Sequence, residues 1–401
     1  MSTGVGYTVM ALVGICVPED SAACLRVVSS ELTFGRIRTI SGLLAARRSV
    51  ACNQLFIAEL VACSVIRSCV YETGVVDESV ICIERMRQRL DKGRTKMKAV
   101  VVQDQSMGSA GMKLMDLPNP QAAINDVIVQ VCAAGFVGTE LSWPSTWIDR
   151  RNLDRTPSIP GRELAGVVTA LGYGTTGLSL GQRVFGIADW YRDGTLAEYV
   201  AIEARRLAPL PGDVDFIVGA SLPISGLTAW QGLFEHGRLR AGQSVIAHGA
   251  AGAVGSMVTQ LARLAGAYVI GTGRAGDRQK ALDFGAQEFV DLDNDRLEDV
   301  GSVDLVFDVI GGDIGKRSAR LIRAGGTLVS IVGPSKARPA DGLAVDFVVE
   351  PDRTHLSEIV QRVRDGRLRT NIGMVSSLDD AVAALNPNGS SKGKTIIRVR
   401  P

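Results

Sequence analysis

The stretch Ser244–Gly255, SVIAHGAAGAVG, constrains the fold more than any other part of the chain. Its apolar start, Val245–Ala247, is typical of a short buried strand, and the apolar residues at helical spacing after it predict a helix from Val254. No side chain in Gly249–Ala253 is larger than a methyl group. Small residues let a phosphate approach the backbone, and the first amides of a helix lack intrahelical partners. The stretch therefore predicts a pyrophosphate site.

The turn departs from the usual glycine fingerprint, because Ala251 stands where the middle glycine is expected. The alternative interpretation is a Gly/Ala-rich helix start that only packs closely on a sheet. The following segments favour the nucleotide site, because apolar runs alternate with helical patterns as in a doubly wound parallel sheet. The predicted strands are Tyr268–Arg274, Glu288–Leu292, Val303–Ile310 and Leu328–Val332, with a helix at Asp277–Phe284.

Ligands of such sheets bind at the carboxyl ends of the strands, where this chain repeatedly places glycine. We therefore predict a Rossmann domain. The candidate cofactor contacts in the turn and at the strand ends are Gly249, Ala250, Ala251, Gly252, Ala253, Val254, Gly255, Gly273, Gly311 and Gly333.

The end of the second strand indicates which nucleotide binds. Gly273 and Arg274 stand where NAD-preferring sites place Asp or Glu, and Arg278 and Lys280 follow one turn later. Arginine pairs with a 2′-phosphate, whereas a carboxylate repels it. The sequence thus favours NADP(H), with Arg274 and Arg278 as contacts. The alternative, ordinary solvated helix charges, stays open because Asp277 lies beside them.

Composition excludes several classes of protein. A net charge of +2 gives no case for nucleic acid or an anionic membrane, and no apolar run reaches the roughly 18–20 residues of a membrane span. Residues 1–96 hold six of the seven cysteines, at spacings that match no zinc signature. We interpret residues 1–96 as an appended or wrongly included leader and Met97 as the functional start. The alternative is a regulatory or docking extension, which would resist limited proteolysis.

Short β-runs separated by Gly and Pro follow Met97 and predict a compact β-rich partial barrel. A helix at Leu356–Val363 and a closing strand at Lys394–Val399 come after the nucleotide-binding part, and we expect this strand to return to the β-rich domain. The β-runs are Lys98–Val102, Asp126–Val131, Leu164–Ala170, Arg183–Gly186 and Leu196–Ala201.

The order of motifs from Met97 to Pro401 resembles the medium-chain dehydrogenase/reductase superfamily, in its quinone-oxidoreductase-like branch. The resemblance implies an α/β fold, with a GroES-like catalytic domain (97–220 and 346–401), a Rossmann NADP-binding domain (221–345) and a substrate cleft between them. It also implies that Thr228 faces the nicotinamide. The matching stretches are Ile159–Val168, Gly181–Gly186, Leu222–Trp230, His248–Gly255, Asp308–Gly312 and Gly325–Ile331.

Zinc-dependent alcohol dehydrogenases of this superfamily carry a Cys where this chain has Val137 and a His where it has Arg162. Valine has no donor atom, and arginine cannot be a neutral nitrogen ligand. Cys132 is the only cysteine after Met97, so the four-thiolate structural site is missing too. We therefore expect no metal.

Without a Lewis acid, oxidation of an alcohol needs another group to stabilise the alkoxide, whereas reduction of a conjugated acceptor needs less stabilisation of this kind. We predict NADPH-dependent reduction of quinones or α,β-unsaturated carbonyls, in which the protein contributes mainly by positioning the nicotinamide against the acceptor. The alternatives are an NADPH-binding sensor or scaffold with little catalysis, and an alcohol dehydrogenase that uses a non-zinc acid.

The candidate acceptor site lies in the β-rich domain. Tyr191 is the candidate proton donor and Arg162 the candidate stabiliser of an enolate, while Val137, Trp143 and Trp147 are candidate substrate contacts. For the aromatic residues the alternative is core or lid packing. For Arg162 it is a salt bridge with Glu163 or Glu140.

Two departures from the family limit what the resemblance implies. Quinone reductases often have Asn at Val137 and Tyr at Leu292, so we expect fewer side-chain contacts to the cofactor. The apolar run Val345–Val349 is implied to pair with its twin in a homodimer, since an uncovered edge strand invites pairing. We expect a cytoplasmic protein.

Overall fold

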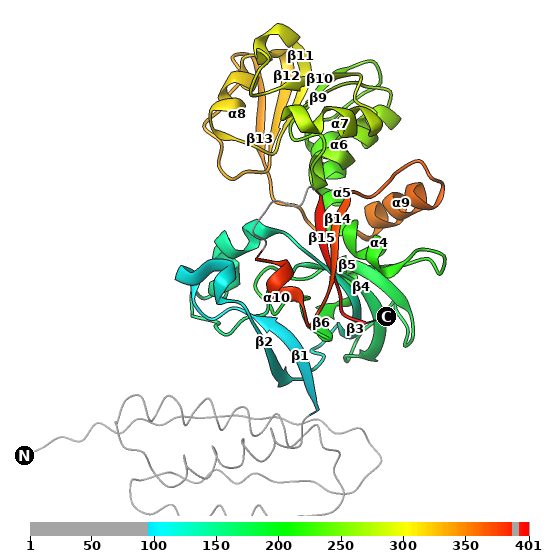
Figure 1. The fold of residues 1–401 in the computed structure, drawn as a ribbon. Coiled ribbons are helices and arrows are strands. Elements are labelled where there is room, and N and C mark those ends of the chain that lie inside the picture. Colours follow the sequence, from blue (N-terminus) through cyan, green and yellow to red (C-terminus); the bar gives the residue numbers. More distant parts are fainter. Residues whose placement is uncertain (1–94, 387–392, 401) are drawn as a thin grey trace, which may run out of the picture. The chain divides into compact units, whose positions relative to one another are not determined.

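Residues 95–386 and 393–400 are described by a computed structural model (Figure 1). The predicted leader or extension lies outside the described residues except for its last two, so its role stays a prediction. Within the described part of the chain, no helix is both long enough and apolar enough to cross a membrane.

One sheet consists of six parallel strands in the order β10-β9-β8-β11-β12-β13. The chain proceeds outward from β8 in one direction and from β11 in the other, and doubly wound sheets bind ligands at this switch point. The predicted doubly wound sheet and α/β class are confirmed. Its elements are β8 (Ser244–Ala247), α6 (Ala253–Leu264), β9 (Tyr268–Gly273), η6 (Ala275–Asp277), α7 (Arg278–Asp283), β10 (Glu288–Asp291), η7 (Leu297–Val300), β11 (Val303–Asp308), α8 (Gly312–Ala319), β12 (Ile322–Ser330) and β13 (Gly342–Asp346).

Helix α6 follows β8 and is held in place by the burial of its one apolar face. Val258, Leu261 and Ala262 are buried, and their spacing places them on the same side of the helix. The helix ends because Gly266 adopts a φ of 82° and its amide donates to the Arg263 carbonyl oxygen at 2.9 Å. This packing holds the start of α6 at the carboxyl edge of the sheet.

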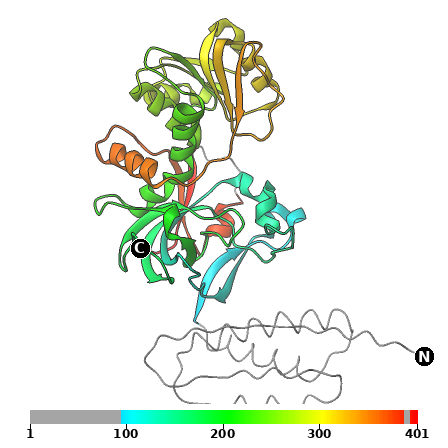
Figure 2. The same cartoon turned by 180° about the vertical axis from the view of Figure 1, so that it is seen from behind.

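The second large sheet is mostly antiparallel, in the order β14-β15-β3-β4-β5-β7, and β6 pairs with β3. Strand β15 pairs with β3, with Ile397 opposite Ala134, which confirms that the closing strand returns to the β-rich domain. Figures 1 and 2 show the two sheets in separate lobes of the ribbon. The remaining elements are β1 (Lys96–Val101), η2 (Gln105–Gly111), β2 (Lys113–Pro118), β3 (Asp126–Phe136), η3 (Gly138–Ser142), α3 (Pro144–Trp147), β4 (Glu163–Leu171), β5 (Arg183–Ile187), β6 (Tyr199–Glu203), η4 (Ala204–Arg206), β7 (Leu207–Pro209), α4 (Phe216–Ser221), α5 (Pro223–Trp230), η5 (Gln231–His236), α9 (Arg353–Arg364), β14 (Ile372–Ser377), α10 (Ala381–Ala384) and β15 (Lys394–Arg398).

The structure corrects the predicted apolar edge strand. The run Val345–Val349 is not one strand, because β13 ends at Asp346 and Val349 is buried. Strand β13 is still the outer strand of its sheet among the described residues, so pairing with a second copy stays a prediction. The predicted domain boundaries fall inside α4 and β13.

Candidate functional site

The predicted phosphate-binding turn follows β8 at the carboxyl edge of the parallel sheet. Gly249 has a φ of 58°, in the left-handed region that favours glycine. The Gly252 amide donates to the Gly249 carbonyl oxygen at 2.7 Å and closes the turn. A Cβ added to Gly255 would lie 2.0 Å from the same oxygen. The turn therefore requires glycine for two different reasons, backbone conformation at Gly249 and close approach at Gly255.

The first amides of α6 have no protein partner. The N–H groups of Ala253, Val254 and Gly255 donate to no acceptor in the described part of the chain. The N-cap residue is Gly252, which has no side chain to cap them, and the first turn contains no acidic residue. Unpaired amides and the positive end of the helix dipole together favour a bound anion. The geometry fits the pyrophosphate of a nicotinamide dinucleotide.

The predicted 2′-phosphate contacts differ in their surroundings. Arg274 follows Gly273 at the end of β9, is exposed, and forms no side-chain hydrogen bond or ion pair within the described residues. Arg278 instead donates to the Phe289 carbonyl oxygen at 3.1 Å and lies 3.3 Å from the Asp295 carboxylate. Of the two predicted contacts, Arg274 is the one whose guanidinium group is available to bind a ligand.

The other predicted cofactor contacts lie at neighbouring strand ends or on a helix beside α6. Gly311 and Gly333, which follow β11 and β12, have φ values of 74° and 93°. The Asp308 carboxylate fixes the first of these turns, because it accepts the Gly311 amide at 2.8 Å. Thr228 is buried on α5, which packs against α6.

His248, in the same turn, has a structural environment. Its ring nitrogens lie 2.7 Å from the hydroxyl oxygens of Thr272 and Ser318. Burial lowers the pKa of His248 to about 4, and the opposing charge of Asp308 only partly offsets this effect. The ring is therefore neutral near pH 7 and joins β8, β9 and α8.

A buried carboxylate joins the segments that carry Val137 and Arg162. Glu140 is fully buried, and its two carboxylate oxygens accept the amides of Val137 at 3.1 Å and Gly161 at 2.9 Å. Burial raises the pKa of Glu140 to about 7, against the opposing charge of Arg162. Glu140 therefore fixes the backbone of both segments and titrates near neutral pH.

Arg162 is fully buried and does not reach the surface. Its Nη1 donates to the carbonyl oxygens of Asp189 and Arg192 at 3.0 and 2.6 Å, while Nε and Nη2 have no partner among the described atoms. The alternative of a salt bridge with Glu163 or Glu140 is not formed in the described part of the chain, although the Glu140 charge acts on it at longer range. Arg162 thus holds the loop between Asp189 and Arg192.

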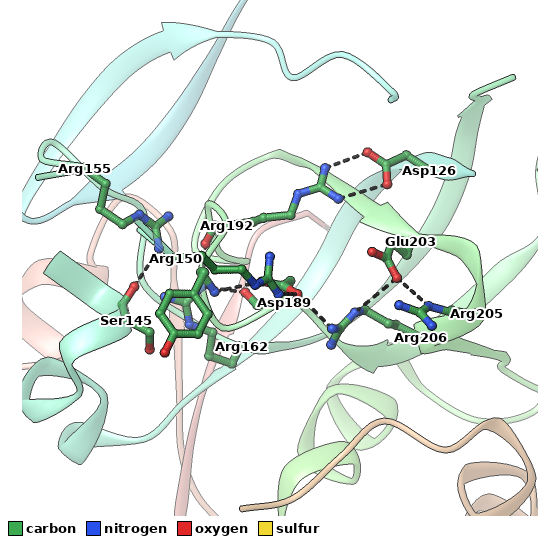
Figure 3. Close-up of polar contacts among 11 residues, drawn as sticks. Asp126, Ser145, Arg150, Arg155, Arg162, Asp189, Arg192, Glu203, Arg205 and Arg206 are labelled. Carbon is green, nitrogen blue, oxygen red and sulfur yellow. Dashed lines mark hydrogen bonds and ion pairs between the residues drawn. The ribbon is translucent and has the colours of Figure 1, made fainter. Parts of the chain in front are cut away.

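That loop carries Tyr191 and is fixed by a cluster of ion pairs (Figure 3). The Asp189 carboxylate accepts the Tyr191 amide at 2.8 Å and lies 2.6 and 2.8 Å from the guanidinium nitrogens of Arg150 and Arg206. Burial raises the pKa of Asp189, but these partners together hold it below its usual value. Tyr191 as a whole residue is 38% exposed. The loop is therefore held rigidly while its tyrosine is accessible.

The predicted substrate contacts separate into core and partly exposed residues. Trp147 is 6% exposed, packs in the core of the β-rich domain and donates to the Leu141 carbonyl oxygen at 2.9 Å. The packing alternative therefore describes Trp147. Trp143 is partly exposed and meets Trp190 edge to face at 5.3 Å, and Val137 is half-buried. Trp143 and Val137 remain candidate contacts.

The residues at the expected metal position do not fit a catalytic zinc ion. Val137 offers no donor atom, the Arg162 guanidinium is a hydrogen-bond donor, and both Glu140 oxygens already accept amides. Among residues 95–386 and 393–400, no group of three His, Cys, Asp or Glu side chains is arranged to hold a metal.

Three residues that shape the site were not predicted as site residues, namely Glu140, Lys394 and Asn371. Lys394 forms a buried ion pair with Glu163, with 2.5 Å between Nζ and Oε1. Asn371 donates to carbonyl oxygens of the phosphate-binding turn. Only Glu140 had a local signal, because a glutamate three residues after a helix N-cap typically accepts the N-cap amide.

The raised pKa of Glu140 predicts a pH-dependent stability. Glu140 titrates at about 4.5 when unfolded and about 7 when folded, so its protonation favours folding below pH 4.5 and this contribution is lost as the pH rises through 7. Glu140→Gln does not titrate. Between pH 4.5 and 7, the free energy of unfolding of wild type should therefore fall by about 3 kcal/mol relative to this variant, measured by denaturant unfolding.

Glu298→Gln is the matched control with the opposite sign. The hydrogen bonds from Arg317 lower the pKa of the exposed Glu298 to about 2, so its stabilisation is present above pH 4.5 and is lost as the pH falls toward 2. Parallel stability profiles for wild type and Glu140→Gln between pH 5 and 7 would contradict the assignment of Glu140.

Two sequence families match the described part of the chain. The family described as "Alcohol dehydrogenase GroES-like domain" matches residues 123–212, in the β-rich domain. The family described as "Zinc-binding dehydrogenase" matches residues 253–344, which begin at α6 and end in β13.

Individual relatives extend these matches. The 2-methylene-furan-3-one reductase of Solanum lycopersicum is 31% identical over 258 residues, which are 61% of this chain and 64% of that protein. This chain thus spans less than two thirds of that reductase. The quinone oxidoreductase of Rattus norvegicus is 31% identical over 242 residues, 57% of this chain and 70% of that protein. The solved quinone oxidoreductase from Coxiella burnetii superposes with a TM-score of 0.70 at 27% identity, covering 76% of this chain and 100% of that one.

Proposed function

Because this chain belongs to the medium-chain dehydrogenase/reductase superfamily, in its quinone-oxidoreductase-like branch, we propose that it is an NADPH-dependent, zinc-independent oxidoreductase. The proposed substrates are quinones or α,β-unsaturated carbonyl compounds. The main support for the proposal is the row of unpaired amides at the start of α6. They lie beside a turn that requires glycine at Gly249 and Gly255. A homodimer in the cytoplasm is part of the same proposal.

The proposed cofactor contacts come from three places in the fold. The amides of Ala253, Val254 and Gly255 would bind the pyrophosphate, and the open guanidinium of Arg274 would pair with the 2′-phosphate. Thr228 on α5 would lie near the nicotinamide. When bound, the nicotinamide supplies the hydride.

On the acceptor side, negative charge develops on a carbonyl or quinone oxygen as the hydride arrives. The Tyr191 hydroxyl is the proposed hydrogen-bond and proton donor to that oxygen, since this side chain is accessible on a fixed loop. Arg162 is fully buried, so its proposed role is positioning: it holds the carbonyl groups of Asp189 and Arg192 on either side of Tyr191. Trp143 and Val137 are the proposed contacts to a flat acceptor.

The experiment that tests this function is NADPH oxidation, followed by absorbance, with a panel of quinones and enones. We expect turnover with at least one acceptor, unchanged after treatment with a chelator. NADPH binding without turnover on any acceptor would contradict the oxidoreductase and favour a sensor or scaffold.

The proposed NADP preference predicts a selective effect at Arg274. Arg274→Ala should raise the Kd for NADPH roughly tenfold to a hundredfold, because a charge-assisted contact to the 2′-phosphate is lost, and should leave the Kd for NADH unchanged. Arg278→Ala is the control, since this side chain already binds Phe289 and Asp295. Isothermal calorimetry measures both. Equal wild-type affinities for NADPH and NADH would refute the preference.

A further inference from the structure

A side chain far along the sequence holds the phosphate-binding turn from outside the Rossmann sheet. Asn371 lies just before β14 and is 6% exposed. Its Nδ2 donates to the carbonyl oxygens of Ala251 at 2.7 Å and Gly252 at 3.0 Å. Both hydrogens of the amide are therefore directed at consecutive carbonyl groups of the turn.

These two carbonyl groups belong to peptide units whose N–H groups matter for ligand binding. Because a peptide unit is planar and trans, fixing the Gly252 carbonyl also fixes the direction of the Ala253 N–H, which is one of the unpaired amides. Fixing the Ala251 carbonyl fixes the Gly252 N–H, which closes the turn on Gly249. Asn371 thus determines where an anion-binding amide points without itself needing to touch the anion.

The backbone around Asn371 is also anchored. Its carbonyl oxygen accepts the Lys394 amide at 2.8 Å, and Lys394 forms the buried ion pair with Glu163 of β4. Two residues earlier, the Arg369 amide donates to the Gln260 side chain of α6 at 2.8 Å, and that side chain donates back to the Arg369 carbonyl oxygen at 3.0 Å. The segment therefore has fixed supports on both sides of the asparagine.

We propose that Asn371 is a positioning residue for pyrophosphate binding, which preorganises the amide of Ala253 through the Gly252 peptide. The proposal rests on the proposed dinucleotide-binding function. It predicts that loss of the Asn371 amide weakens every ligand that contains a pyrophosphate, whichever nucleotide carries it, and spares ligands that lack one.

Calorimetric titrations of the full chain test this role with two variants and one control. Asn371→Ala removes both donors, and Asn371→Asp keeps the size but places a carboxylate against two carbonyl groups. Ser377→Ala is the control, because it alters the far end of β14, where the exposed Ser377 hydroxyl donates to the Asp380 carboxylate, and leaves the supports of Asn371 in place. We expect the Kd for NADPH, NADH and ADP-ribose to rise about tenfold in Asn371→Ala and further in Asn371→Asp. Ser377→Ala should stay within about twofold of wild type, and 2′-AMP should bind all four proteins equally.

The possible results distinguish failure of the positioning role from failure of the proposed dinucleotide-binding function. If wild type binds no dinucleotide, both the positioning role and the proposed function are wrong. If wild type binds and both Asn371 variants bind as tightly, or if Ser377→Ala weakens binding as much as they do, only the positioning role is overturned. Should Asn371→Ala fail to fold, Asn371→Leu decides the question, because it nearly keeps the size of the side chain, removes both donors and adds no buried charge.

Discussion

Replacing Gly255 with alanine is expected to lower the free energy of unfolding by about 3 kcal/mol or more and to abolish dinucleotide binding. The new methyl group would lie 2.0 Å from the Gly249 carbonyl oxygen and 2.9 Å from that of His248. Both are backbone atoms in a turn closed by the Gly252 amide, so no side chain can move aside. The turn must open, and opening it moves the amides at the start of α6 away from the anion.

Gly252→Ala is the matched control in the same turn. Gly252 has a φ of −82°, which any residue adopts, and its Cβ would lie 3.1 Å from the Gly249 oxygen. We expect a loss in the free energy of unfolding below about 1 kcal/mol, so denaturant unfolding should clearly separate the two variants. Equal stability of Gly255→Ala and Gly252→Ala would show that the turn tolerates a side chain at Gly255.

The Rossmann lobe could be predicted because its signals are local. Strand β8, the glycine turn and α6 are adjacent in sequence, and each is indicated by its own apolar spacing and residue size. Strand β12 was predicted from Leu328 but begins at Ile322, because Ile322 pairs with Val303 of β11 and Gly326 pairs with Gly342 of β13. These ladder partners come from distant segments, and no local pattern reveals them.

The supporting contacts of the site could not be predicted for the same reason. Asn371 and Ala251 are 120 positions apart, and Glu163 and Lys394 come from strands β4 and β15, which are also far apart in the sequence. Arg162 was predicted to stabilise an enolate in the acceptor site, but the structure buries it, and its hydrogen bonds to the Tyr191 loop depend on how that loop folds back. Spacing indicates which residues share an element, whereas tertiary packing decides which side chains meet.

Lys394→Met is expected to lower the free energy of unfolding by about 3–5 kcal/mol, measured by denaturant unfolding. The Nζ of Lys394 lies 2.5 Å from Glu163 Oε1, and the two side chains are 3% and 0% exposed. Removing the lysine leaves a carboxylate that, within the described residues, retains only the Ile224 amide at 2.9 Å as a hydrogen-bond donor. A buried charge without its partner costs far more than the pair contributes when intact.

The double variant Glu163→Gln/Lys394→Met separates lost charge compensation from lost packing. It removes the orphaned charge while keeping the Ile224 contact, so it should recover most of the loss, and its coupling energy should far exceed that of an exposed pair. Lys98→Met breaks such a pair, since Lys98 and Asp379 lie 2.7 Å apart with side chains 50% and 65% exposed, and we expect only a small change. If Lys394→Met were no more destabilising than Lys98→Met, or if the double variant recovered nothing, charge burial would not be what makes Lys394 necessary. A large loss with recovery in the double variant would instead show that Lys394 is needed to compensate the buried charge of Glu163, and Lys394 is also the residue whose amide anchors Asn371 beside the turn.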